Sequence, residues 1–65
     1  MYINIEIERV RRRMTKSVLA KRLAVSAGVL EDWVYGRSAI PAGKLYALLE
    51  LFDGCSADYL LKQRR

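Results

Sequence analysis

The fold of this chain is decided by residues 15–36, which read TKSVLAKRLAVSAGVLEDWVYG. Thr15 and Ser26 each suit the N-cap of a helix, because a hydroxyl at that position accepts a hydrogen bond from a backbone N–H of the first turn. The turn between the two segments is Ala24-Val25-Ser26, and Gly36 favours the left-handed conformation that often ends a helix. The stretch therefore predicts two short, capped helices joined by a tight turn.

The spacing of apolar residues predicts which sides of these two helices face the core. In the first helix, expected over about residues 16–24, Val18, Leu19 and Leu23 face inward, and the small Ala20 lets another helix cross closely. In the second helix, expected over about residues 27–35, the predicted apolar face consists of Val29, Leu30, Trp33 and Val34. We therefore interpret Trp33 as a core residue and not as an exposed stacking platform.

A further helix is expected before this pair, from about Asn4 to Arg13, with Asn4 as its N-cap. An alternative is that residues 1–5 begin as an extended segment, because Tyr2 and its isoleucine neighbours favour strands. The predicted buried stripe of this helix follows helical spacing and consists of Ile3, Ile7, Val10 and Met14.

Two more helices are expected after the pair. Ile40-Pro41 opens the fourth, because proline suits a first helical turn, and Gly54 stops it. Its apolar side follows the i, i+3, i+4, i+7 pattern of Leu45, Leu48, Leu49 and Phe52. Ser56 is the predicted cap of the fifth helix, whose apolar part is Tyr59, Leu60 and Leu61. The sequence thus predicts one all-α domain of five helices over residues 1–65, with a helix-turn-helix at about 15–36.

Composition narrows the function. The chain has 65 residues, 52% of them hydrophobic, which is typical of one small globular domain. It has no apolar run approaching the roughly 20 residues of a membrane span and no signal-peptide pattern, so we expect a cytoplasmic protein. Histidine is absent and Cys55 is the only cysteine, which argues against a metal site and an internal disulfide. We expect no cofactor, and an enzyme is the least expected class.

The charge distribution suggests a polyanionic partner. The net charge is +5 and the pI about 9.8. Seven cations and no acid lie between Arg9 and Arg22, and a second basic cluster, Lys62, Arg64 and Arg65, ends the chain. A basic balance of this kind is typical of nucleic-acid binders, although a solvated surface with a basic tail is an equal alternative.

A helix about 10–12 Å across also matches a major groove about 12 Å wide, so the predicted helix pair has a suitable size for double-stranded DNA.

The chain resembles the Cro/repressor (Xre-type) helix-turn-helix family over nearly its whole length. The resemblance is carried by TKSVLAKRLAVSAGVLEDWVYGRSAIPAGKLYALLELFDGCSADYLL, from Thr15 to Leu61. The opening NIEIERVRRRMT, from Asn4 to Thr15, is similar to a subgroup found in prophages and mobile elements of Gram-positive bacteria. The resemblance implies a five-helix, lambda-repressor-like domain that binds double-stranded DNA as a homodimer and regulates transcription, with repression as the expected outcome.

The resemblance also implies which residues contact DNA. The residues that would contact bases lie at the start of the second helix of the pair. The first residue of the first helix, Lys16, would also contact bases. This chain departs from the family pattern there, because Ala27 and Gly28 have no side-chain donors or acceptors and Glu31 and Asp32 are acidic. Glu31 has two interpretations, an acceptor for a cytosine amine or a charge repelled by phosphates. The predicted DNA-contacting residues are Thr15, Lys16, Ser26, Ala27, Gly28, Glu31, Tyr35, Arg37, Ser38 and Lys44.

Other interpretations of the same sequence stay open. Several predicted phosphate contacts are equally well explained as plain surface residues, and Gly28 either lets the helix approach bases closely or merely weakens the helix. The predicted dimer surface is Tyr59, Leu60 and Leu61, with packing into the core as an alternative that explains at least half of this group. The competing functions are a protein-interaction module on the same scaffold and an architectural binder with little sequence preference. No small-molecule effector is expected, because the chain has no room for an effector domain.

Overall fold

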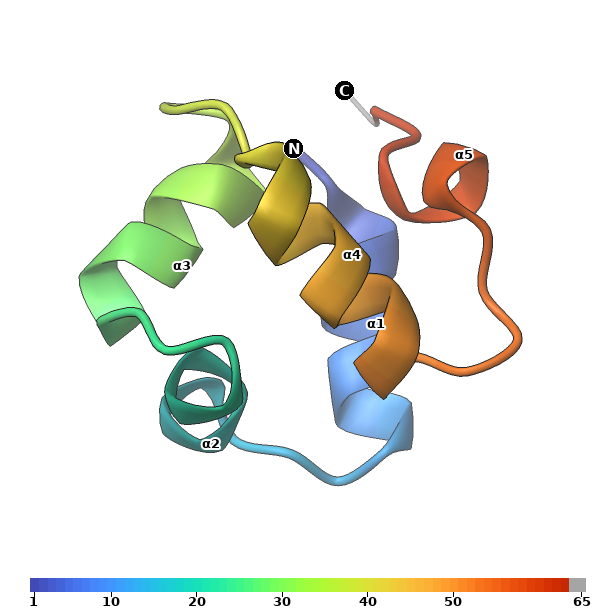
Figure 1. Cartoon of the computed structure of the whole chain (residues 1–65), viewed down its shortest axis with the longest axis horizontal. Helices are drawn as coiled ribbons and strands as arrows, with labels where there is room; N and C mark the ends of the chain where they lie inside the picture. The colour runs from blue at the N-terminus through green and yellow to red at the C-terminus, as the bar shows by residue number, and fades with distance from the viewer. Residues whose placement is uncertain (64–65) are drawn as a thin grey trace.

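The computed structural model describes residues 1–63, which form five α-helices and no strand. In Figure 1, α2 and α3 lie on one side of α4, α5 lies on the other, and α1 runs behind α4. The all-α, five-helix prediction with a helix-turn-helix is therefore confirmed. Arg64 and Arg65, predicted to belong to the second basic cluster, lie outside the described residues. The helices are α1 (Ile3–Arg11), α2 (Lys16–Arg22), α3 (Ala27–Tyr35), α4 (Ala42–Leu51) and α5 (Ala57–Leu60).

Every described helix contributes to a single apolar core. Trp33 is 6% exposed and packs within it, so its interpretation as a core residue is confirmed. Ala20 is 3% exposed, as expected for a small residue where helices pack closely. The buried hydrophobic residues are Ile5, Leu19, Ala20, Leu23, Leu30, Trp33, Val34, Leu48, Phe52 and Leu60.

The predicted helix caps form as hydrogen bonds. The hydroxyls of Thr15, Ser26 and Ser56 each accept from the backbone N–H three residues later, at 3.1, 3.2 and 3.1 Å respectively. Each bond satisfies an N–H that has no partner within its own helix. Gly36 follows α3 with φ 79°, in the left-handed region, as predicted. These local signals fix where α2, α3 and α5 begin and where α3 ends.

The predictions for α1 are partly wrong. Asn4 does not cap the helix, because α1 begins at Ile3, and the alternative of an extended start is wrong for the same reason. The predicted buried stripe is also wrong in its central part, since Ile7 is 41% and Val10 is 61% exposed. The side that α1 buries consists of Asn4, Ile5 and Glu8.

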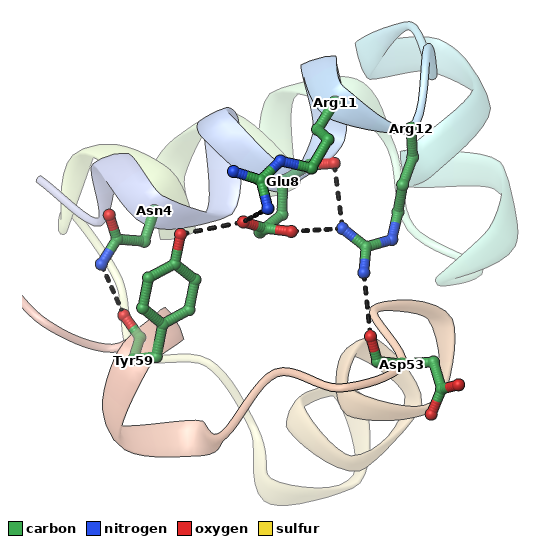
Figure 2. Close-up of polar contacts among 6 residues, drawn as sticks. All are labelled: Asn4, Glu8, Arg11, Arg12, Asp53 and Tyr59. Atoms are coloured by element: carbon green, nitrogen blue, oxygen red, sulfur yellow. Dashed lines mark hydrogen bonds and ion pairs between the residues drawn. The ribbon is translucent and has the colours of Figure 1, made fainter.

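Polar contacts with α5 explain why α1 buries this side (Figure 2). The side-chain amide of Asn4 donates to the backbone oxygen of Tyr59 at 2.8 Å, and the Tyr59 hydroxyl donates to Glu8 Oε2 at 2.8 Å. Arg12 donates to the other carboxylate oxygen of Glu8 and to the backbone oxygen of Asp53, the latter at 3.1 Å. Rotating α1 to bury Ile7 would break these hydrogen bonds between α1 and the α5 region.

Three further residues differ from their predicted positions. Val18 and Val29 were expected to face inward but are 43% and 39% exposed. Leu60 was expected on a dimer surface but is 0% exposed within the core, so it cannot contact a partner in this fold. The remaining two residues of that predicted surface, Tyr59 and Leu61, are half-buried.

Candidate nucleic-acid interface

The α2–α3 pair is held in one arrangement by its turn and by α4. The backbone N–H of Val25 donates to the oxygen of Ala20 at 3.0 Å, and Ala24 lies between them with φ 58°. Lys44 on α4 donates from Nζ to the backbone oxygen of Leu23 at 2.8 Å. A lysine ammonium is favourable at a helix C-terminus, where backbone oxygens lack partners. The pair is therefore a fixed unit that presents α3 in one orientation.

The outward side of α3 carries little side-chain bulk at its start. Ala27, Gly28 and Tyr35 are exposed, whereas the opposite side of the helix is packed into the core. A Cβ built on Gly28 would meet only the Ser26 hydroxyl oxygen, at 4.0 Å. At Ala27 and Gly28, α3 thus presents only backbone and one methyl group to a partner.

Two ion pairs border this exposed side. Lys16 Nζ, at the start of α2, lies 3.4 Å from Glu31 Oε1 on α3. Arg37, just after α3, lies 3.6 Å from Asp32 Oδ1. The side chains of all four residues are 38–56% exposed, so each pair contributes at most about 1 kcal/mol. A polyanion can therefore compete for both cations at little cost.

An aromatic ring supports the second of these pairs. The Arg37 guanidinium lies over the ring of Tyr35, with its carbon 5.1 Å from the ring centroid. A contact of this kind adds about 0.5–1 kcal/mol at an exposed site. Tyr35 thus keeps the arginine beside the end of α3.

The fold brings most of the predicted DNA-contacting residues to one face of the molecule, and it places the Lys44 ammonium away from that face. Lys16, Ser26 and Glu31 lie with the start of α3, and Ser38 is exposed in the segment after it. Lys44 is the exception, because its ammonium is directed to the end of α2. Thr15 and Ser26 use their hydroxyl oxygens as caps, so they offer only the hydroxyl hydrogen to a ligand.

Less of the positive charge before α3 is free than the sequence suggests. Of the seven cations from Arg9 to Arg22, four pair with acids. Among the described residues, Arg13, Lys21 and Arg22 have no ion pair and are exposed. The spacing of Glu6 to Arg9, and of Glu8 to Arg11 and Arg12, is three or four residues, a signal that would have found three of the four pairs.

A second polar site lies between α1 and the segment before α5. It is a pocket of about 540 Å³ lined by Glu8, Arg11, Arg12, Asp53, Gly54, Cys55, Ser56 and Tyr59. The hydrogen bond from Arg12, and then that from Tyr59, hold the pKa of Glu8 below its ordinary value. The hydrogen bond that Tyr59 donates to Glu8 raises the pKa of Tyr59 above its ordinary value. Both carboxylate oxygens of Glu8 accept hydrogen bonds, and the polar contacts of this site hold α1 to α5.

A metal site, a membrane-spanning helix and similarity to known proteins were the remaining indications of function, and none was found for the described residues. No three metal-binding side chains cluster anywhere in residues 1–63. No helix of that part is long and apolar enough to cross a membrane. The chain matches no protein-family model, and comparisons with the curated proteins and with the solved structures return no similar protein.

Proposed function

We propose that the protein is a small cytoplasmic transcriptional regulator, most simply a repressor encoded by a prophage or mobile element, that binds double-stranded DNA. The observation that carries this proposal is the fixed α2–α3 pair, whose exposed α3 face is bordered by the cations Lys16 and Arg37. A helix presented in this way fits a major groove. The sequence resemblance to the Cro/repressor family supports this proposal. The proposed protein acts by binding and not by catalysis.

Each cation at this face has a proposed role. Lys16 and Arg37 leave their carboxylates and contact phosphates on either side of the groove, while Tyr35 keeps Arg37 in place. Phosphate contacts supply affinity and make it strongly dependent on salt. Ala27, Gly28 and Glu31 lie at the groove floor, where Glu31 accepts from a cytosine amine.

Selection from a random pool of duplexes, followed by titration at low and high salt, tests the proposal. We expect an enriched sequence that binds more tightly than random duplex, with affinity falling steeply as salt rises. Arg37→Ala should weaken binding to both selected and random duplexes. Lys62→Ala is a matched control, since Lys62 is an exposed cation beyond α5. Absence of binding to any duplex at low salt rejects the proposal.

The acidic side of α3 favours a second candidate function, an interaction with proteins. Glu31 and Asp32 neutralise the two cations nearest α3 in the free protein, and Ala27 and Gly28 offer no base-specific donor or acceptor. Binding to duplexes with no preference among sequences would instead indicate an architectural role. Capture of a protein through α3, without duplex binding, would indicate an interaction module.

A further inference from the structure

The exposed start of α3 is apolar. Ala27 and Gly28 are exposed, and Val29, the third residue of the helix, is 39% exposed. None of the three has a side-chain hydrogen-bond donor or acceptor, and the first turn of α3 contains no acidic residue. A partner that approaches this turn therefore meets methyl groups and backbone.

Gly28 lies at the centre of this surface. The residues that α3 buries are Leu30, Trp33 and Val34, and at about 3.6 residues per turn Gly28 lies almost directly opposite them. A Cβ built on Gly28 would meet only the Ser26 hydroxyl oxygen, at 4.0 Å. An apolar group of a partner can therefore come into van der Waals contact with the helix backbone at this position.

In a major groove, this surface suits one chemical group. Each base pair presents its own pattern of donors and acceptors there, and thymine alone of the four bases also presents a methyl group, at C5. Apolar side chains recognise that methyl group by packing against it. The amines of cytosine and adenine would lose hydrogen bonds to water at this turn without gaining a side-chain acceptor, which is unfavourable.

We propose that the first turn of α3 recognises the C5-methyl group of a thymine, which packs over Gly28 between Ala27 and Val29. Recognition of the methyl group rests on the proposed function, since it requires α3 to lie in the major groove. It gives a base-reading role to residues that lack polar side chains. Glu31, about one turn further along α3, keeps its proposed contact with a cytosine amine.

Replacement of thymine by uracil in the selected duplex tests the proposal, because it removes the methyl group and keeps every hydrogen-bonding group of the base pair. Each thymine is replaced in turn, and affinity is measured by fluorescence anisotropy. Burial of one methyl group corresponds to about a fourfold change in affinity. We expect a loss of that size at the thymine that packs over Gly28, and little change at thymines outside the interface.

Cytosine and 5-methylcytosine at the same position form the second comparison. These two bases differ only in the C5-methyl group, and neither has the O4 acceptor of thymine. If α3 recognises the methyl group, the duplex with 5-methylcytosine should be bound about fourfold more tightly than the duplex with cytosine. This comparison distinguishes recognition of the methyl group from recognition of the thymine oxygen.

A methyl group added to the protein provides the third comparison. Gly28→Ala places a methyl group where that of thymine is proposed to pack, so the variant should bind the thymine duplex several-fold more weakly. It should bind the thymine and uracil duplexes equally, or prefer uracil, because removal of one methyl group makes room for the other. Gly43→Ala is the matched control and should keep the preference for thymine, since Gly43 is the exposed second residue of α4 and also leaves room for a Cβ.

Failure of methyl recognition and failure of the proposed function give different results. A protein that binds no duplex rejects both. A protein that binds its selected duplex and tolerates every uracil replacement rejects methyl recognition alone. A preference for thymine that Gly28→Ala leaves unchanged also overturns it, because the methyl group then acts through the shape of the DNA.

Discussion

Ala24 adopts a left-handed backbone conformation in the turn between α2 and α3, with φ 58°. A non-glycine residue in this region is less favourable by about 1–2 kcal/mol. The turn stores this strain because α2 and α3 both pack into the core on either side of it.

Replacing Ala24 with glycine should therefore stabilise the protein. We expect Ala24→Gly to raise the free energy of unfolding by about 1 kcal/mol, after allowing for the greater freedom of glycine in the unfolded chain. The midpoint of thermal unfolding should rise by about 4–8 °C for a domain of this size. Gly36→Ala, at φ 79°, should lower it. An unchanged midpoint for Ala24→Gly would mean that the turn carries no strain.

Glu8 and Tyr59 make stability depend on pH in opposite directions. The pKa of Glu8 is lowered on folding, chiefly by the hydrogen bond from Arg12. Its contribution is therefore present above the ordinary carboxyl pKa and is lost as pH falls through the lowered value. The pKa of Tyr59 is raised, chiefly by its bond to Glu8. Its contribution is present below the ordinary tyrosine pKa and is lost as pH rises through the raised value.

Denaturant unfolding across the pH range should consequently show a plateau of stability with an acidic and an alkaline limb. We expect Glu8→Gln to be less stable on the plateau and to have a shallower acidic limb. Tyr59→Phe should flatten the alkaline limb. If Glu8→Gln kept the acidic limb of the unmodified chain, another carboxyl group would be responsible for it.

Features of the helices that depend on residues close together in the sequence were predicted correctly, and a feature that depends on distant residues was not. The beginnings of α2, α3 and α5 were predicted correctly, because each cap hydroxyl and its N–H are three residues apart. The buried side of α1 was predicted wrongly, because Glu8 and Tyr59 are 51 residues apart in the chain. Apolar spacing alone favoured Ile7 and Val10, and it contains no information about a distant tyrosine.

The candidate site shows the same division. Its helices and most of its residues could be predicted from caps and resemblance, but the pairing of Lys16 with Glu31 joins different helices. Lys44 was predicted to lie near a phosphate, whereas it binds the end of α2 across 21 residues. Such pairings depend on how helices are placed, which local sequence patterns do not describe.

Two glycines at equivalent helix positions allow a controlled test of α3. Gly28 and Gly43 are each the second residue of a helix, are exposed, and leave room for a Cβ. Changing either to alanine should raise the free energy of unfolding by about 0.5–1 kcal/mol. If α3 enters the major groove, Gly28→Ala should also weaken binding to the selected duplex, because its methyl group holds the helix away from the bases. Gly43→Ala should not, as fluorescence anisotropy would measure.

At the scale of the whole molecule, the net charge of +5 hides an internal competition. Lys16 and Arg37 each have a carboxylate partner in the free protein, and DNA must displace both partners to use these cations. The weakness of exposed pairs makes the exchange easy. Under the proposed function, the acids would then lie near phosphates and oppose binding to any duplex, so they would reduce non-specific affinity more than affinity for a site that uses Glu31.

Removing the charge of Glu31 should therefore change affinity and specificity in opposite ways. We expect Glu31→Gln to bind random duplex several-fold more tightly, because Lys16 becomes free and a repelled charge is lost. The slope of log affinity against log salt should become steeper by about 0.9 for one additional phosphate contact. Preference for the selected sequence over random duplex should fall, since glutamine prefers adenine to cytosine. Asp32→Asn should reproduce the tighter random binding and leave the preference unchanged. A Glu31→Gln protein with weaker random binding would show that the carboxylate positions Lys16 for phosphate instead of competing with it.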